Sequence, residues 1–439
     1  MNDIAPYGSL FTPFHINRLR VANRIIMGPM AVLQPHADGT PSDQTRAFLT
    51  ERARGGVGMI IVGGSAATAR GVAEAPFSPL LRFDNDSTVP PLRRVTDAVH
   101  EHETPIVAQI FSGFGRMGNP GPGRPILAAS ARNVHMSEDH LPPGLFIPGG
   151  RVTPTPEEAT ERDIAQVQRD VVAAAARARS AGFDGIEIAA HMCYFYSSFL
   201  SPLSNRRTDQ YGGDAANRAR ILVDVLRALR SELGSDYPIG LRMSVNDHMQ
   251  GGQGPEGFAD VAAEVARAGI DYIAMTDGNY ESMDINVPSE SGTMLEHGEP
   301  AIFRSKVGDV PLFLSSTYDP RMGAAAIESG QADALMLARQ LLADPAFADK
   351  LKHGREDEIV WCDHQNSCLR RLILNVPVRC HQNPTMGREA REPGQRPPFS
   401  RVLRRPVEDA VIGLAGSTRV MGIASKLAAK KGARARRQE

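Results

Sequence analysis

The chain has 439 residues, of which 42% are hydrophobic and 23% charged, which suits one large domain with an appendage or two medium domains and argues against extended disorder. A net charge of −1 excludes a globally basic nucleic-acid binder, and four cysteines are too few for a fold held by disulfides, so a reducing cytoplasm is the expected compartment. The sequence has no run of about 18 apolar residues and no signal-peptide pattern at its N-terminus, so we expect no membrane span and no cleaved leader.

Eight short apolar runs recur along the chain. Each is too short and too continuous for a helix, and each suits a strand that is buried on both faces. In chain order they are residues 24–30, 57–62, 105–111, 184–189, 238–243, 271–275, 310–314 and 332–337.

Amphipathic helical patterns alternate with these runs, at residues 163–181, 217–233, 258–268 and 320–329. In the first pattern Val167, Val171 and Ala178 share one face, and Gly182 ends it. Eight strand–helix units are the number that closes a parallel barrel, so we predict an α/β chain with a (β/α)8 TIM barrel. A doubly wound open sheet is the alternative, because counting strands does not show closure.

Two long insertions follow strands, residues 113–156 after the third run and residues 278–299 after the sixth. Loops in such positions lie at the C-terminal face of a barrel, where active sites are built. Residues 113–118, GFGRMG, satisfy the G-x-G-x-x-G pattern. The prolines that follow it cannot continue a helix, so we do not interpret it as a dinucleotide-binding motif.

The strand–helix repeat stops near residue 354. We therefore predict three parts, namely a barrel over residues 1–355, a Cys/His segment with a linker over 356–400, and a basic tail over 401–439. The tail has ten Lys or Arg residues and three acidic ones. Such a tail can contact phosphates, but it is more often a solvated chain end.

The ends of the last two strands suggest a phosphate site. Ser315 and Ser316 follow the seventh run, and Ala338 and Arg339 follow the eighth. Barrels commonly bind a phosphate there through backbone N–H groups, and an arginine would add charge. A surface arginine at a strand end is the alternative interpretation of Arg339.

Aromatic residues are concentrated just after the fourth run, where Tyr194, Tyr196 and Phe199 follow one another closely. We expect Phe199 in the core and at least one of the two tyrosines at the barrel mouth. The sequence has no G-x-S-x-G and no H-E-x-x-H pattern, so hydrolase and zinc-protease functions have little support.

Four residues beyond the barrel are candidate metal ligands: Cys362, His364, Cys368 and Cys380. In a cytosolic protein such a set is more often metal-binding than disulfide-bonded, and it could hold zinc or an iron–sulfur cluster. Only one residue separates Cys362 from His364, which is tight for two ligands of one metal. Unligated cysteines are the alternative.

Several long motifs resemble those of a known family. Residues 199–230, FLSPLSNRRTDQYGGDAANRARILVDVLRALR, look like the signature of the Old Yellow Enzyme flavoproteins, and residues 10–30 look like that family's opening. The resemblance covers roughly residues 8–385. The CHQNPTMG segment resembles the larger branch of the family, which includes 2,4-dienoyl-CoA reductase and trimethylamine dehydrogenase. The resemblance implies an eight-stranded barrel that carries FMN.

The resemblance also implies which residues contact FMN. Gln109 matches a glutamine on the pyrimidine side of the flavin ring, and Arg242 matches an arginine beside flavin N1 and O2. Ser315 and Ala338 stand where the family usually has glycine. The full set of matching positions is Pro29, Met30, Ala31, Gly64, Gln109, Arg242, Ser315, Ser316, Ala338 and Arg339.

The implied catalytic residues are less regular. Tyr194 matches a proton-donating tyrosine of the family. Family members often grip a substrate carbonyl with His-x-x-His or His-x-x-Asn after the fourth strand, but here Ala189 and Met192 occupy those positions and His191 is offset. The candidate catalytic residues are therefore Tyr194, His191 and Tyr280.

In the larger branch four cysteines hold a [4Fe–4S] cluster. Cys368 and Cys380 align with the last two cluster ligands, and His364 falls on the position of the second. The position of the first ligand holds Trp361 in this chain, and Cys362 lies one place after it. The branch continues into a nucleotide-binding domain, which this chain would lack. Residues 411–416, VIGLAG, resemble a remnant of that domain's first strand and turn.

The sequence thus predicts an FMN oxidoreductase that transfers hydride between flavin N5 and a small organic substrate, most simply by ene-type reduction with NAD(P)H. The other electron source would be a partner protein. One alternative is oxidation of an amine or N-methyl compound, with Tyr194, Tyr196 and Tyr280 offering ring faces to a cation. Another is a flavin-binding subunit without turnover. A homo-oligomer is left open, and no nucleic acid or membrane partner is expected.

Overall fold

The computed structural model describes all residues except 1–4, 148–149, 392–409, 411 and 415–439. Most of the predicted basic tail, residues 401–439, lies outside the described residues, and so does much of the 411–416 segment. The predicted boundary between residues 355 and 356 stays a prediction.

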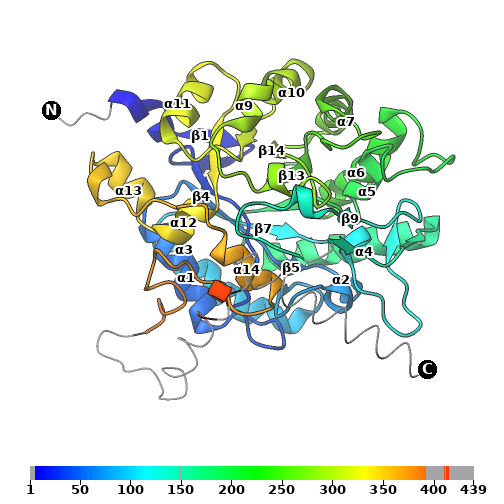
Figure 1. Ribbon diagram of the computed structural model, residues 1–439, viewed down its shortest axis with the longest axis horizontal. Helices are drawn as coiled ribbons and strands as arrows, with labels where there is room; N and C mark the ends of the chain where they lie inside the picture. The colour runs from blue at the N-terminus through cyan, green and yellow to red at the C-terminus, as the bar shows by residue number, and fades with distance from the viewer. Residues whose placement is uncertain (1–4, 148–149, 392–409, 411, 415–439) are drawn as a thin grey trace.

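Eight parallel strands close into a barrel at the centre of the molecule (Figure 1). Each strand overlaps one of the eight predicted runs, so the prediction of a (β/α)8 TIM barrel is confirmed and the open sheet is excluded. In hydrogen-bonded order the strands are β12 (Gly185–Ala190), β13 (Ile239–Ser244), β14 (Tyr272–Thr276), β15 (Leu312–Leu314), β16 (Ala334–Leu337), β3 (Ile25–Met27), β4 (Met59–Val62) and β7 (Ile106–Ile110).

Helices surround the barrel, at least one after each strand (Figure 1). The four predicted helical patterns overlap α4, α6, α7 and α11, and α4 begins with a capping box between Thr160 and Asp163. The main helices are α1 (Asp43–Arg54), α3 (Val89–His100), α4 (Glu161–Ser180), α6 (Ala215–Leu233), α7 (Pro255–Arg267), α10 (Glu299–Val307), α11 (Pro320–Glu328), α12 (Arg339–Ala343) and α13 (Phe347–Lys352).

The barrel interior is filled by side chains from most of its strands. The ring of Tyr272 stacks on that of Phe313, with ring centroids 4.5 Å apart. Gly240 makes room for this pair, because a Cβ atom there would lie 2.0 Å from the Tyr272 ring. The β1–β2 hairpin (Phe14–Ile16 and Leu19–Val21) closes the N-terminal end, where Asn17 donates a hydrogen bond to Asp271 just before β14. A binding site can therefore open only at the C-terminal ends of the strands.

The two insertions form the loops at that C-terminal end. The described part of residues 113–156 contains only short 3-10 turns and two-residue strands, and residues 278–299 contain α8 (Met283–Asn286) and α9 (Thr293–His297). The GFGRMG motif does not open an α-helix. Its Gly115 has a φ of +52°, and a Cβ there would lie 2.6 Å from the backbone nitrogen of Phe195, so the glycine serves close packing between two loops.

The Cys/His segment is bound to the barrel. It contains α14 (Ser367–Ile373), and its Val378 N–H donates to the carbonyl of Val32 at 3.0 Å. Further along, Glu389 forms an ion pair with Arg52 of α1 at 2.9 Å, and both side chains are buried. Each charge depends on the other, because an unpaired buried charge is costly. Among the described residues no helix is long and apolar enough to cross a membrane.

Replacing Glu389 by alanine should lower the free energy of unfolding by about 3 kcal/mol, because the Arg52 guanidinium would stay buried without its counter-charge. Urea unfolding followed by circular dichroism measures this change. The matched control is Asp236→Ala, which breaks the exposed pair with Arg18 and should cost less than about 1 kcal/mol. Equal unfolding midpoints for the two variants would contradict the role of the buried pair.

Candidate active site

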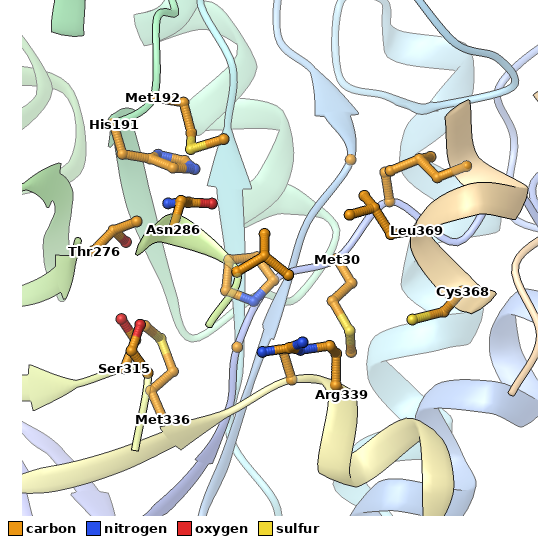
Figure 2. A pocket seen from close by; sticks show the side chains of 18 of the residues that line it. Met30, His191, Met192, Thr276, Asn286, Ser315, Met336, Arg339, Cys368 and Leu369 are labelled. Carbon is orange, nitrogen blue, oxygen red and sulfur yellow. The ribbon is translucent and has the colours of Figure 1, made fainter. Parts of the chain in front are cut away.

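A cavity of about 290 Å³ opens at the C-terminal ends of the barrel strands (Figure 2). All ten residues predicted to contact FMN line it, and so do Tyr194, His191 and Tyr280. Of the four predicted metal ligands, His364 and Cys368 line it, whereas Cys362 and Cys380 do not. The structure therefore gathers into one place residues that are spread over more than 300 positions of the sequence.

The turns after β3 and β4 bring backbone close to the cavity. The Gly28 N–H donates to the carbonyl of Leu337 at 2.7 Å and so joins the ends of β3 and β16. Gly64 has a φ of +69°, and a Cβ atom there would lie 2.7 Å from Cα of Ala31. Only glycine suits this position, which lets Pro29, Met30 and Ala31 form one wall of the cavity.

Gln109 is oriented by a buried carboxylate. Its amide nitrogen donates to Glu187 Oε1 at 2.7 Å, and the Tyr272 hydroxyl donates to Glu187 Oε2 at 3.1 Å. This bond uses one of the two N–H donors of Gln109 and fixes its amide group, so the amide oxygen is left to accept a hydrogen bond in the cavity. Burial raises the pKa of Glu187 to about 7, against the lowering effect of Arg242.

Arg242 places a cation in the same cavity. Its Nε donates to the Thr276 hydroxyl at 2.8 Å, which fixes the side chain between β13 and β14. Burial lowers its pKa, while the nearby Glu187 raises it, and a guanidinium keeps its charge in proteins. This cation would stabilise negative charge on a group bound against it.

The ends of β15 and β16 offer a cradle for an anion. Among the described residues, the backbone N–H groups of Ser316, Thr317, Ala338 and Arg339 donate to no other protein group. The Thr317 hydroxyl is also buried without a partner. Unpaired backbone donors are the groups that bind phosphate in barrels of this kind.

Arg339 is half-buried at this cradle, so it is not a surface arginine. One of its terminal nitrogens donates to Asn366 Oδ1 at 2.8 Å and the other to the carbonyl of Pro288 at 2.6 Å. Figure 2 shows its side chain reaching toward the middle of the cavity. Arg339 therefore supplies charge to the site and also ties the β14 insertion to the Cys/His segment.

His191 faces the cavity, close to Met192 (Figure 2). Its Nδ1 is buried without a partner. Burial, with a further contribution from Arg242, holds its pKa well below the usual range, so the imidazole is neutral and can donate one hydrogen bond. Of the two family gripping positions, Met192 lines the cavity but Ala189 does not.

Tyr194 and Tyr280 form a pair of hydroxyl groups at the cavity, 2.9 Å apart. Burial raises the pKa of Tyr194 well above its ordinary value, and burial raises that of Tyr280 to about 12. Both phenols are therefore protonated at neutral pH. Tyr196 is also buried but does not line the cavity, so of these two tyrosines it is Tyr194 that faces the barrel mouth.

The Cys/His segment forms a further wall. Cys368, Leu369 and Leu372 of α14 line the cavity (Figure 2). Burial raises the pKa of Cys368 to about 11, and the nearby thiols of Cys362 and Cys380 raise it as well. Within the described part of the chain, no three of the four predicted ligand atoms lie within 4.8 Å of one another, so they do not form a single-ion site. Whether they hold a cluster stays a prediction.

Sequence reasoning missed several residues of the site. Glu187 lies within the fourth apolar run, and a carboxylate in the middle of such a run was a signal that something inside the barrel must pair with it. Thr276, which holds Arg242, is the last residue of β14, and no pattern in the sequence distinguishes it. The wall formed by Leu369 and Leu372 had no signal, because it depends on how the segment folds back.

The cation, the oriented amide and the cradle of free N–H groups suit a flavin mononucleotide, whose ring and phosphate need such partners. Together with the parallel barrel they define a flavin-binding barrel of the oxidoreductase class. The chain belongs to the NADH:flavin oxidoreductase / NADH oxidase family, whose sequence pattern matches residues 9–358.

Relatives with assigned functions agree with this. The metal reductase of Desulforamulus reducens is 35% identical over 386 residues, which cover 87% of this chain and 54% of that protein. The NADH oxidase of Thermoanaerobacter brockii is 31% identical over 432 residues, 97% of this chain and 62% of that protein. The chain thus spans about half to three-fifths of the length of these relatives.

Solved structures give the same result. A 2-naphthoyl-CoA reductase in complex with 2-naphthoyl-CoA has a TM-score of 0.78 and 25% identity, covering 88% of this chain and 58% of that chain. An old yellow enzyme homologue from Zymomonas mobilis has a TM-score of 0.64 and 26% identity, covering 78% and 92%. The resemblance to the Old Yellow Enzyme family is confirmed.

Replacing Arg339 by alanine should weaken FMN binding about tenfold, because a charged hydrogen-bond donor at the anion cradle is lost. The dissociation constant can be measured from flavin fluorescence after the protein is stripped of cofactor and reloaded. Arg321→Ala is the control, since Arg321 is exposed and outside the cavity. Unchanged FMN retention in Arg339→Ala would show that the Arg339 side chain does not contact the cofactor.

Proposed function

We propose that this chain catalyses the reduction of an activated carbon–carbon double bond in a small organic substrate, with NAD(P)H as electron donor and FMN as cofactor. The observation that carries the proposal is the pair of protonated phenols, Tyr194 and Tyr280, whose hydroxyl groups lie 2.9 Å apart at the cavity. Reduction of a double bond needs a proton for one carbon as well as a hydride for the other, and a protonated phenol supplies the proton.

FMN, when bound, supplies hydride transfer at its N5 atom. The residues that would hold it are those of the cavity wall. The amide oxygen of Gln109 would accept from the pyrimidine ring, and Arg242 would lie beside its oxygens. The N–H groups of residues 316–317 and 338–339 would bind the phosphate.

The other cavity residues would handle the substrate. The neutral His191 would donate a hydrogen bond to the substrate carbonyl oxygen and so replace the missing family pair. Tyr194 would then give its proton to the substrate carbon next to the carbonyl. Tyr280 is only partly buried, so it could return a proton to Tyr194 from solvent through their hydrogen bond.

The charge of the cavity favours this reaction over amine oxidation. No aspartate or glutamate is among the described residues that line the cavity. Arg242 and Arg339 both line it. A cationic amine would therefore find no carboxylate counter-charge in the cavity wall, and Tyr196, one of the three rings expected to face it, does not line the cavity. A carbonyl or acyl substrate suits the site better. The name of the structurally similar 2-naphthoyl-CoA reductase, which refers to an acyl-CoA substrate, supports this choice.

We further propose that Cys362, His364, Cys368 and Cys380 hold an iron–sulfur cluster. The three thiols influence one another's pKa, and His364 Nδ1 is buried without a partner. A cluster of four irons holds its ligands farther apart than a single ion does, so it does not require three of these ligand atoms within 4.8 Å of one another. Histidine replaces cysteine as an iron ligand in Rieske centres.

Tyr194→Phe should slow the substrate half-reaction by about 100-fold, because the proton donor at the cavity is lost. Flavin reduction by NADPH should be nearly unchanged. In the unaltered protein the substrate half-reaction should be flat between about pH 8 and 10, above the pKa of Glu187, since both phenols keep their protons below their raised pKa values. Stopped-flow absorbance at the flavin band measures both half-reactions.

The matched control is Tyr196→Phe, which removes a buried hydroxyl that has no partner and lies outside the cavity. Its half-reactions should equal those of the unaltered protein. Equal substrate rates for Tyr194→Phe and Tyr196→Phe would move the proton donor to another residue. Flavin that is reduced by neither NADH nor NADPH, and reoxidised by no enone, would instead favour the subunit without turnover.

Anaerobically purified protein should contain about four irons and four sulfides per chain if the cluster is present. Cys368→Ser should lose most of this iron while keeping FMN. Iron and sulfide analysis alongside flavin absorbance gives both numbers. Iron-free protein with its full content of FMN would rule out the cluster.

A further inference from the structure

A second cluster of metal-ligating side chains lies outside the cavity. His248, Asp277, His297 and Glu299 each offer one ligand atom, and these four atoms all lie within 4.8 Å of one another. None of the four residues lines the cavity. Within the described part of the chain, no other group of three or more such side chains meets this criterion.

The four residues come from three separate segments. His248 lies in the loop after β13, and Asp277 follows the last residue of β14 directly. His297 ends α9 and Glu299 begins α10, with Gly298 between them at a φ of +79°. The tight turn at Gly298 brings the last two residues to the same point.

The two carboxylates each have one oxygen held by protein and one oxygen free. Asp277 Oδ1 accepts from the Gly278 N–H at 2.9 Å, and Glu299 Oε1 accepts from the Asn246 amide at 3.0 Å. Asp277 Oδ2 and Glu299 Oε2 are buried and have no hydrogen-bond partner among the residues that the structure describes, and both residues are 0% exposed. Two buried carboxylate oxygens without partners are costly unless a cation sits between them.

The imidazoles are close to these carboxylates. His248 Nε2 lies 2.6 Å from Asp277 Oδ1 and 3.5 Å from Glu299 Oε1, and His297 Nδ1 lies 3.9 Å from Glu299 Oε2. Ligand atoms around a tetrahedral zinc ion lie about 3.3 Å apart, given bond lengths near 2.0 Å. Small side-chain movements would therefore bring all four atoms to that geometry.

We propose that these four residues bind a divalent cation of the zinc class at a structural site. Two neutral imidazoles and two carboxylates carry a total charge of −2, which such an ion balances. Four protein ligands close a tetrahedral shell, as in structural rather than catalytic zinc sites. The side chain of His297 is 47% exposed, which gives the ion a path from solvent.

The site would fix the β14 insertion, residues 278–299, to the end of the barrel. This insertion supplies Tyr280, Asn286 and Pro288 to the cavity, and the Asn286 amide donates to the Asp277 carbonyl at 2.7 Å. In Figure 1 the insertion, which contains α9, runs from the end of β14 to the start of α10, in yellow-green. The ion would thus act as a clamp on one cavity wall without touching the substrate.

The test is metal binding by the FMN-loaded, full-length protein after chelation and dialysis. Zn²⁺ titration by calorimetry should give one site that His297→Ala and Glu299→Gln each weaken at least about tenfold. Glu296→Gln changes an exposed neighbour and should bind as the unaltered protein does. Cys368→Ser should keep this site, which separates it from metal at the Cys/His segment.

Two further readouts keep the result clear. Co²⁺ at this site should give the intense visible bands of a tetrahedral ion, and Zn²⁺ should raise the melting temperature of the unaltered protein but not that of folded His297→Ala. The proposal is overturned if His297→Ala and the unaltered protein bind the same amount of Zn²⁺ with equal affinity. It is also overturned if folded, chelated protein takes up neither Zn²⁺ nor Co²⁺.

Discussion

Closure of eight parallel strands into a filled barrel is the constraint on which the rest of this structure depends. Parallel closure points every strand's carboxyl end to the same side, so loops far apart in the sequence meet at one mouth. The interior must be filled to close-packed density, which is why a glycine at position 240 faces the ring of Tyr272. The β1–β2 hairpin blocks the other end, so the chemistry has one place to occur.

Charge inside the barrel then organises the mouth. Glu187 is buried beneath the cavity, where it accepts from Gln109 and from Tyr272 and lies near Arg242. A buried carboxylate needs hydrogen-bond donors and a nearby cation. The hydrogen bonds that Gln109 and Tyr272 donate to Glu187 also fix the orientation of these two side chains. The same interaction that makes an acidic side chain tolerable in the core therefore also sets which way Gln109 presents its amide oxygen to a bound ring.

The fold could be predicted from the sequence because each strand is a short apolar run between helical patterns, and eight repeats leave few topologies. The residues expected to contact FMN, such as Gln109 and Arg242, could be named because they match positions of a known family, and the structure places them along one cavity. The hydroxyl pair of Tyr194 and Tyr280 could be named only as two candidates. Their contact joins the loops after β12 and β14, and no local pattern encodes it.

The carboxylate–imidazole cluster illustrates the same limit. His248 and Asp277 are 29 positions apart, and His297 and Glu299 lie in an insertion with no regular pattern. A metal site can be recognised from residue spacing only when its ligands lie close together in the sequence, on one hairpin or one helix face. Here the ligands come from the loop after β13, the end of β14 and the turn between α9 and α10, so only the closed barrel brings them together.

Arg339 has a thermodynamic consequence, because its two hydrogen bonds join the anion cradle, the β14 insertion and the Cys/His segment through a single guanidinium. A ligand that stabilises Arg339 in its present orientation must also stabilise its hydrogen bonds to Asn366 and Pro288, and so the positions of the two segments that carry them. If Arg339 holds the cofactor phosphate, linkage makes the effect reciprocal, so contacts that hold the C-terminal segment on the barrel would also favour cofactor retention. The buried ion pair between Arg52 and Glu389 is one of those contacts.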